Sequence, residues 1–187
     1  MFRSGSTVIE QLLGRHPLVQ IGGELELIPA LVHERLMPYP AALQSLDADA
    51  KCDLRDTYLA AVAANFPGAR YVTDKRPDNF LHIGLIKAMF PNARIVHTVR
   101  EPLDVILSNW FLHLDRSMGH ALDLEDLAHW HGQYVRLMRH WKALYPDILD
   151  LDYDDLVADL EHRRRAFDLL PGDFGDVDQP LDAAEVD

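Results

Sequence analysis

The stretch that decides the fold is Phe90-Pro91-Asn92-Ala93-Arg94-Ile95-Val96-His97-Thr98-Val99-Arg100-Glu101-Pro102. A helix is predicted over residues 79–90. The Pro91-Asn92 pair ends it and is followed by a tight turn, and the β-branched residues within 94–99 predict a strand. Pro102 then opens another helix, because its fixed φ and missing N–H suit the first helical position. Helix, turn, strand and helix in this order indicate an α/β fold with a parallel sheet flanked by helices.

A similar order of helix end, tight turn and strand is predicted one αβ unit earlier in the chain. Phe66-Pro67-Gly68-Ala69-Arg70-Tyr71-Val72 follows the pattern, which we interpret as shared αβ geometry rather than a true repeat. Further helices are expected over 6–14, 24–36, 54–64, 123–143 and 155–170, and further strands over 18–21 and 148–153. We expect one domain over residues 1–170, followed by an acidic tail over 171–187 whose composition does not favour folding.

Composition limits the classes of function. The chain has 187 residues, 48% of them hydrophobic, which is enough for one core. The net charge of −12 argues against a nucleic-acid surface and requires that locally placed cations hold any anionic ligand. No apolar run approaches the ~20 residues that span a bilayer, and residues 1–15 do not read as a signal peptide. The single Cys52 fits a reducing compartment, so we expect a cytoplasmic protein without a membrane partner.

The segment Arg3-Ser4-Gly5-Ser6-Thr7 has the features of a phosphate-binding loop. Gly5 lets the backbone turn close to an anion, and Ser6 and Thr7 start a helix whose free N–H groups and positive dipole end favour phosphate. The loop is not a Walker A motif, because Ser6 replaces the lysine before the hydroxyl residue. A capped surface helix has a similar sequence, so these residues alone leave both interpretations open.

Further motifs follow this loop in a fixed order. They are His16-Pro17, Gly22-Gly23-Glu24-Leu25, Thr73-Asp74-Lys75-Arg76-Pro77-Asp78-Asn79-Phe80, Phe90-Pro91-Asn92-Ala93-Arg94, Val99-Arg100-Glu101-Pro102-Leu103-Asp104 with Ser108, and Tyr153-Asp154-Asp155-Leu156-Val157. Over residues 2–160 the chain resembles the sulfotransferase superfamily, most closely the tyrosylprotein sulfotransferase branch and its bacterial relatives, which often carry tetratricopeptide repeats. The resemblance implies transfer of a sulfuryl group from 3′-phosphoadenosine-5′-phosphosulfate (PAPS) to an acceptor hydroxyl. The product is 3′-phosphoadenosine-5′-phosphate (PAP), and no metal is needed.

The resemblance also implies which residues bind the donor. The loop residues Arg3, Ser4, Gly5, Ser6 and Thr7 would hold the 5′-phosphosulfate. Arg100 and Ser108 would bind the 3′-phosphate from two sides. A helix that begins at Pro102 rises ~9 Å by Ser108, and the planar guanidinium of an arginine can bind a phosphate through two N–H groups. The alternative for Arg100 is a surface ion pair with Glu101 or Asp104. Tyr153 would line the nucleotide pocket, and a core tyrosine is its alternative.

Two residues match the catalytic positions of the family. Glu24 would take the proton from the acceptor hydroxyl, although an acid at this place is also a common helix N-terminal residue. Lys75 would stabilise the bridging oxygen as charge develops there. Its alternative is a solvated loop lysine beside Asp74. No His, Asp and Glu set has convincing metal-ligand spacing, and His97 is interpreted as a buried histidine with satisfied hydrogen bonds.

The sequence departs from the family at three places. Only Met1 and Phe2 stand where a first strand precedes the loop, and the C-terminal segment is acidic where the family carries serine and basic residues. Leu25 and Glu26 replace the basic residues of the tyrosylprotein branch, so the acceptor is left open as a small molecule or peptide with a hydroxyl.

Two other functions remain as alternatives. One is a truncated, non-catalytic remnant that binds nucleotide weakly or pairs with another protein, including a second copy of itself, through exposed sheet edges. The other is a nucleotide kinase, which the missing loop lysine disfavours.

Overall fold

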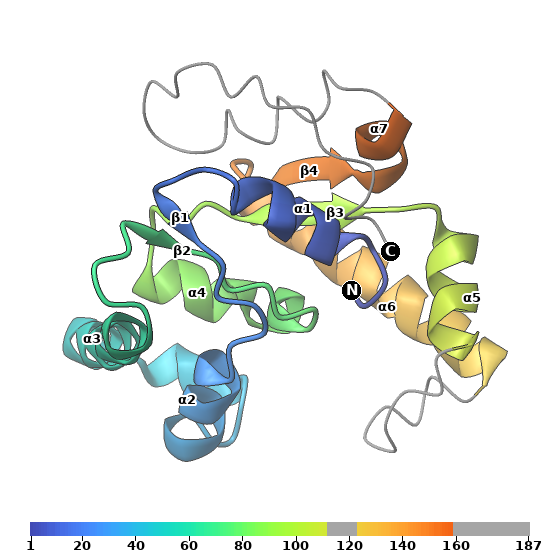
Figure 1. Cartoon of the computed structure of the whole chain (residues 1–187). Helices are drawn as coiled ribbons and strands as arrows, with labels where there is room; N and C mark the ends of the chain where they lie inside the picture. Colours follow the sequence, from blue (N-terminus) through green and yellow to red (C-terminus); the bar gives the residue numbers. More distant parts are fainter. Residues whose placement is uncertain (112–122, 159–187) are drawn as a thin grey trace.

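The structure is a computed structural model that describes residues 1–111 and 123–158. Helices and short parallel strands alternate along the chain (Figure 1). The elements are α1 (Ser6–Leu13), β1 (Val19–Gln20), α2 (Leu27–Arg35), the 3-10 helix η1 (Ala41–Ser45), α3 (Ala48–Asn65), β2 (Tyr71–Val72), the 3-10 helix η2 (Asn79–His82), α4 (Ile83–Met89), β3 (Val96–Val99), α5 (Pro102–Phe111), α6 (Leu124–Leu144), β4 (Leu149–Asp152) and α7 (Tyr153–Ala158).

The strands form two parallel pairs. β1 pairs with β2, with Val19 opposite Tyr71, and β3 pairs with β4, with Val96 opposite Leu149. Parallel strands that alternate with helices confirm the predicted α/β class. In the described residues each sheet has two strands, so β2 and β3 each have one strand neighbour.

Helices cover both faces of the strands, as expected for parallel sheets. On one face, the apolar side chains of α1 and α7 pack on β1 and β4; they are Ile9, Leu12, Leu13, Val19, Leu151 and Leu156. On the other, α4, α5 and α6 contribute Ile83, Val105, Tyr134 and Met138, which pack with Met1 and Ile148. A third cluster joins α2, α3 and α4 through Ile28, Leu31, Leu36, Leu54, Leu85 and Met89. The strands therefore lie between two apolar layers.

Some boundaries differ from the sequence prediction for local reasons. α3 begins at Ala48 rather than at residue 54, because the Asp47 carboxylate accepts a hydrogen bond from the Ala50 N–H at 2.8 Å and caps the helix. α2 begins at Leu27 rather than at residue 24. The structure describes the last helix, predicted over 155–170, only as far as Ala158, and the predicted tail lies outside the described residues.

A cavity of about 1210 Å³ lies between the two sheets. Its walls include Val72 of β2, Val96 of β3 and Ile9 of α1, and it extends to Ser6 and Lys75. The cavity is thus bounded by both strand pairs and by the helix that follows the loop. That a first strand and a C-terminal segment are missing stays a prediction.

Within residues 1–111 and 123–158, no helix combines the length and apolar character that crossing a membrane requires. The same residues contain no group of three or more His, Cys, Asp or Glu side chains placed to hold a metal ion.

Candidate functional site

The predicted phosphate loop is a left-handed turn that leads into α1. Arg3 has φ of 65° and Gly5 has φ of 89°, a region that favours glycine. Gly5 itself is the N-cap of α1, and no side chain caps the helix, so Ser6 and Thr7 stand inside the first turn rather than at the cap. The early N–H groups of this helix therefore have the orientation that binds an anion.

Buried polar side chains fix the loop to the core. Ser4 is 2% exposed, and its hydroxyl donates to the Met1 carbonyl at 2.8 Å and lies 2.5 Å from the Thr98 hydroxyl of β3. Asn109 of α5 donates to the Phe2 carbonyl at 3.2 Å. Ser4 was predicted to bind the donor; its side chain faces the protein interior and holds the loop to β3.

Three predicted donor-binding residues, distant in sequence, meet at this loop. The Arg3 Nε donates to the Ser108 Oγ of α5 at 2.9 Å. The Arg100 guanidinium donates to the Arg3 carbonyl at 3.4 Å and pairs with Asp104 at 3.3 Å. Arg100 thus makes both the contact with the loop and the ion pair with Asp104, which the sequence left as its alternative role. The Arg100 Nε is buried and has no hydrogen-bond partner in the described residues.

Tyr153, at the start of α7, joins the same group. Its ring centroid lies 4.9 Å from the Arg100 guanidinium carbon, a cation–π distance. A Cβ placed on Gly5 would lie 2.1 Å from the Tyr153 Cδ2. The half-buried tyrosine therefore packs directly on the loop glycine and is not a remote core residue.

Glu24 and Lys75 form the second half of the site. The Lys75 Nζ and the Glu24 Oε1 are 2.8 Å apart, and the two side chains are 15% and 47% exposed. Glu24 is not the cap of α2, because Glu26 holds that position and no side chain makes a capping bond there. Lys75 is not a freely solvated loop lysine either, since it is largely covered and paired. Glu24 therefore does not cap α2, and Lys75 pairs with Glu24.

One residue that lies outside all the motifs of the sequence connects these halves. Glu10 lies on α1 and is 4% exposed, and its Oε1 accepts from the Gly23 N–H at 3.0 Å and from the Thr73 hydroxyl at 2.5 Å. A carboxylate on the apolar face between Ile9 and Leu13 is the sequence signal that could have found it, because unpaired buried carboxylates are rare.

His97 of β3 makes hydrogen bonds with both ring nitrogens. Its Nδ1 lies 2.7 Å from the Asp150 Oδ1 and its Nε2 bonds the Tyr134 hydroxyl. Burial lowers the pKa of His97, although Asp150 acts in the opposite direction. This arrangement agrees with a satisfied structural histidine.

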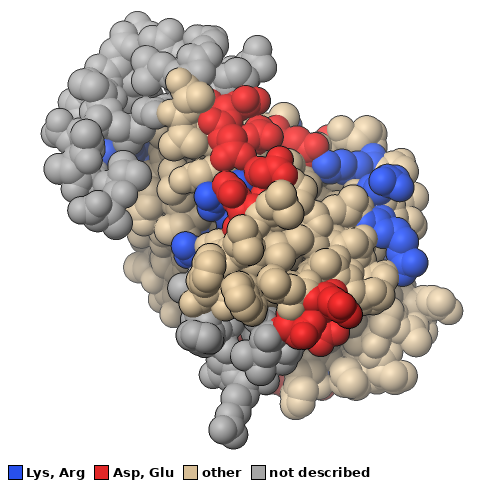
Figure 2. Space-filling view, turned by 90° about the vertical axis from the view of Figure 1, so that its right-hand side faces the viewer, with Lys and Arg blue, Asp and Glu red and all other residues tan. Residues whose placement is uncertain are grey.

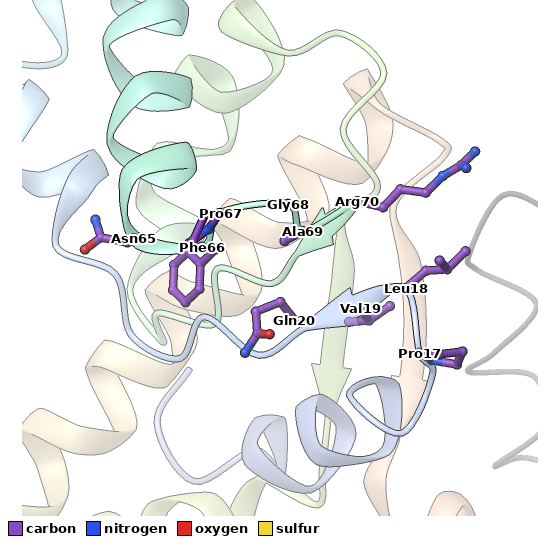
Figure 3. A pocket seen from close by; sticks show the side chains of 10 residues that line it. All are labelled: Pro17, Leu18, Val19, Gln20, Asn65, Phe66, Pro67, Gly68, Ala69 and Arg70. Carbon is purple, nitrogen blue, oxygen red and sulfur yellow. The ribbon is translucent and has the colours of Figure 1, made fainter.

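A separate pocket of about 510 Å³ lies beside β1 and the start of β2. Figure 3 shows its lining, which comes from residues 17–20 and 65–70. None of the predicted donor-binding or catalytic residues lines it. Of the predicted donor-binding and catalytic residues, Ser6 and Lys75 line the larger cavity.

Charges of both signs lie close together on one face of the protein (Figure 2). On the face shown in Figure 2, Asp and Glu side chains gather into patches, with Lys and Arg side chains beside them. Together with the net charge of −12, this arrangement means that an anion is attracted by a few local cations and not by the field of the whole protein.

Comparison with known proteins gives two matches. A family model described as the sulfotransferase family matches residues 1–166. An uncharacterized protein of Aquifex aeolicus (strain VF5) is 36% identical over 177 residues, which cover 86% of this chain and 23% of that protein. The chain thus spans less than a quarter of the length of this relative. No solved structure matches the chain.

Proposed function

Since the chain belongs to the sulfotransferase family, we propose that it binds PAPS and transfers the sulfuryl group to an acceptor hydroxyl. The observation that carries the proposal is the meeting of Arg3, Arg100 and Ser108 at the loop before α1. Their contacts join positions 97 and 105 residues apart. Such convergence of cations and helix N–H groups suits a ligand with two phosphate groups.

The donor would lie across two parts of this loop. The backbone from Arg3 to Thr7 faces the 5′-phosphosulfate, which the positive end of α1 favours. Arg100 and Ser108 face the 3′-phosphate, and the Tyr153 ring lies against the guanidinium of Arg100. The Arg100 Nε, which is buried and has no hydrogen-bond partner among the described residues, supports this assignment, because a buried donor without an acceptor is costly.

The chemistry follows from the paired side chains on the other half of the site. Glu24 takes the proton of the acceptor hydroxyl, whose oxygen then forms a bond to sulfur. The bond between sulfur and the bridging phosphate oxygen breaks, and PAP leaves with the electron pair. Lys75 and the first N–H groups of α1 stabilise the charge on that oxygen. Positioning and electrostatics thus supply the catalysis, as in phosphoryl transfer.

The donor site is tested first by calorimetric titration with PAP in the absence of magnesium. We expect a dissociation constant on the order of micromolar and much weaker binding of ADP, which lacks the 3′-phosphate. Failure of a folded sample to bind PAP would contradict the proposal. Binding of ADP that requires magnesium would instead favour the nucleotide kinase.

The base is tested by Glu24→Ala. We expect turnover to fall by on the order of a hundredfold or more, with the PAP dissociation constant little changed, because Glu24 reaches the donor side only through its contact with Lys75. PAP release from PAPS, measured with a panel of phenols, alcohols and peptides, reports turnover. Glu26→Ala, an exposed acid two residues away, is the matched control. Turnover that survives Glu24→Ala would show that another group is the base.

A second candidate is binding without catalysis, either of nucleotide or of another protein. Two observations favour it: the cavity between β2 and β3, and the fact that each of these strands has one strand neighbour in the described residues. Strand edges of this kind pair readily with other chains. Sedimentation distinguishes the two functions. A monomer that melts cooperatively and turns over PAPS would exclude this candidate. The acceptor, the absence of nucleic-acid and membrane partners and the cytoplasmic location stay predictions.

A further inference from the structure

Glu10 is a buried carboxylate in the helix that begins at the phosphate loop. It is 4% exposed and lies among the apolar residues of α1, although burial of a charge is costly unless hydrogen bonds compensate it. In the described residues, both hydrogen bonds of its side chain reach out of the helix, to the turn before Glu24 and to the end of β2. We propose that Glu10 is a positioning residue that places the Glu24–Lys75 pair relative to the donor loop, an inference that rests on the proposed function.

The first link runs from α1 to the turn that carries Glu24. The Gly23 N–H donates to the Glu10 Oε1 at 3.0 Å. Gly23 has φ of 68°, so this turn adopts a conformation that other residues rarely take. A hydrogen bond to a carboxylate is stronger than a neutral one, and this one holds the peptide between Gly22 and Gly23, one residue before Glu24.

The second link runs from α1 to the segment that carries Lys75. The Thr73 hydroxyl donates to the same Glu10 oxygen at 2.5 Å and accepts from the Gly22 N–H at 3.0 Å. A Cβ on Gly22 would lie 2.1 Å from the Thr73 carbonyl oxygen, which shows how closely the two backbones approach. The Lys75 N–H also donates to the Gly23 carbonyl at 2.8 Å.

These links define the distance between the two halves of the site. α1 begins after Gly5, and at ~1.5 Å per residue Glu10 lies ~7.5 Å along the helix from the loop. A single carboxylate oxygen therefore ties the donor loop, the base and the lysine into one unit. Misplacement of a reacting group by ~1 Å can cost on the order of a hundredfold in rate.

The test replaces Glu10 and separates donor binding from turnover. In Glu10→Leu, which keeps a similar volume, we expect kcat to fall by about 10- to 100-fold. The PAP dissociation constant should change by less than about threefold. Glu10→Gln retains an acceptor oxygen and should restore most of the kcat. Gln11→Ala, an exposed neighbour on α1, is the matched control.

If Glu10→Leu folds poorly, a second variant tests the same proposal. Thr73→Val removes the hydroxyl while the shape of the side chain is kept, and it should lower kcat in the same direction. Combined with Glu10→Gln it should cost less than the sum of the single effects, because both residues act through the same turn. Amide resonances of ¹⁵N-glycine should shift for Gly22 and Gly23 and stay in place for Gly132.

Each outcome decides the proposal. If Glu10→Leu lowers the PAP affinity and kcat by equal factors and also lowers the melting temperature, Glu10 has a structural role only. Loss of turnover in Glu24→Ala but not in Glu10→Leu would overturn the role of Glu10 alone. Turnover that survives Glu24→Ala would overturn the base of the proposed function and the positioning with it.

Discussion

Gly5 shows how closely the residues of the site approach one another. Its φ of 89° and the ring of Tyr153 both exclude a side chain, since a Cβ there would lie 2.1 Å from the Tyr153 Cδ2. The glycine thus serves the loop conformation and the packing of the tyrosine at once. A substitution at this position tests whether the loop and Tyr153 act together.

Gly5→Ala should destabilise the protein and weaken PAP binding. Left-handed strain costs roughly 1–2 kcal/mol in an alanine, and the overlap with Tyr153 adds about 1–3 kcal/mol. Thermal unfolding and PAP titration measure the two effects. Gly68→Ala is the matched control, because Gly68 has φ of 80° and nothing within 4 Å of its Cβ position. If Gly5→Ala costs no more than Gly68→Ala, the contact with Tyr153 is unimportant.

At the scale of elements, a polar network joins β3, β4 and α6. His97 lies between the Asp150 carboxylate and the Tyr134 hydroxyl, and Lys142 donates to Asp150 at 2.5 Å. Burial raises the pKa of Asp150, but hydrogen bonds from Lys142 and His97 outweigh it and leave the pKa below its ordinary value. The network keeps buried polar atoms satisfied next to the helix pair that covers β3.

This network predicts a pH dependence of stability. Burial lowers the pKa of His97, and it does the same for His82 and His131. Below the ordinary value of about 6.5 the unfolded chain therefore binds more protons than the folded chain, so the free energy of unfolding falls as the pH falls. The free energy of unfolding falls in this way mainly below about pH 6.5, and each histidine changes it by at most about 1.4 kcal/mol per pH unit.

Melting temperatures between about pH 7.5 and 5.5 measure this effect, a range in which Asp150 stays ionised. His97→Gln should show a shallower loss of stability than the wild type, because one of the groups that contribute to the slope is removed. The same substitution at the exposed His129 of α6 is the matched control. A slope in His97→Gln that equals the wild-type slope would contradict the assignment.

At the scale of the whole molecule, the charge opposes the ligand that the site is proposed to bind. The chain carries a net charge of −12, and acidic patches lie on the face shown in Figure 2. PAP is itself an anion, so the approach to the site is repulsive at long range. Among the described residues, Arg3, Lys75, Arg100 and the start of α1 provide local attraction at the site.

The association rate constant for PAP should therefore rise when salt is raised from about 20 to about 200 mM. Salt screens the long-range repulsion, since the Debye length is about 10 Å at 0.1 M and shorter above it. The dissociation rate constant should rise as well, because the local contacts weaken. Stopped-flow measurements separate the two constants. An association rate that falls with salt would show that the local cations steer the ligand from a distance.

The sequence by itself determined the elements that depend on near neighbours. The helix expected over 123–143 is α6, and the Asp123 carboxylate caps it by accepting from the Glu125 N–H at 2.7 Å. The strand before Arg100, the helix after Pro102 and the helix after Gly5 also lie close to their predicted places. Capping, proline geometry and apolar periodicity act within a few residues, so they can be seen in the sequence.

The tertiary structure alone decided which side chains meet. Arg3 and Ser108 are 105 residues apart, and Glu24 and Lys75 are 51 apart; the sequence suggested their roles only through the family resemblance. Glu10 had no such signal beyond its place on an apolar face, and its contacts with Gly23 and Thr73 exist only once α1 packs over the end of β2. Long-range contacts depend on how buried layers pack against one another, which is a property of the whole fold rather than of any local pattern.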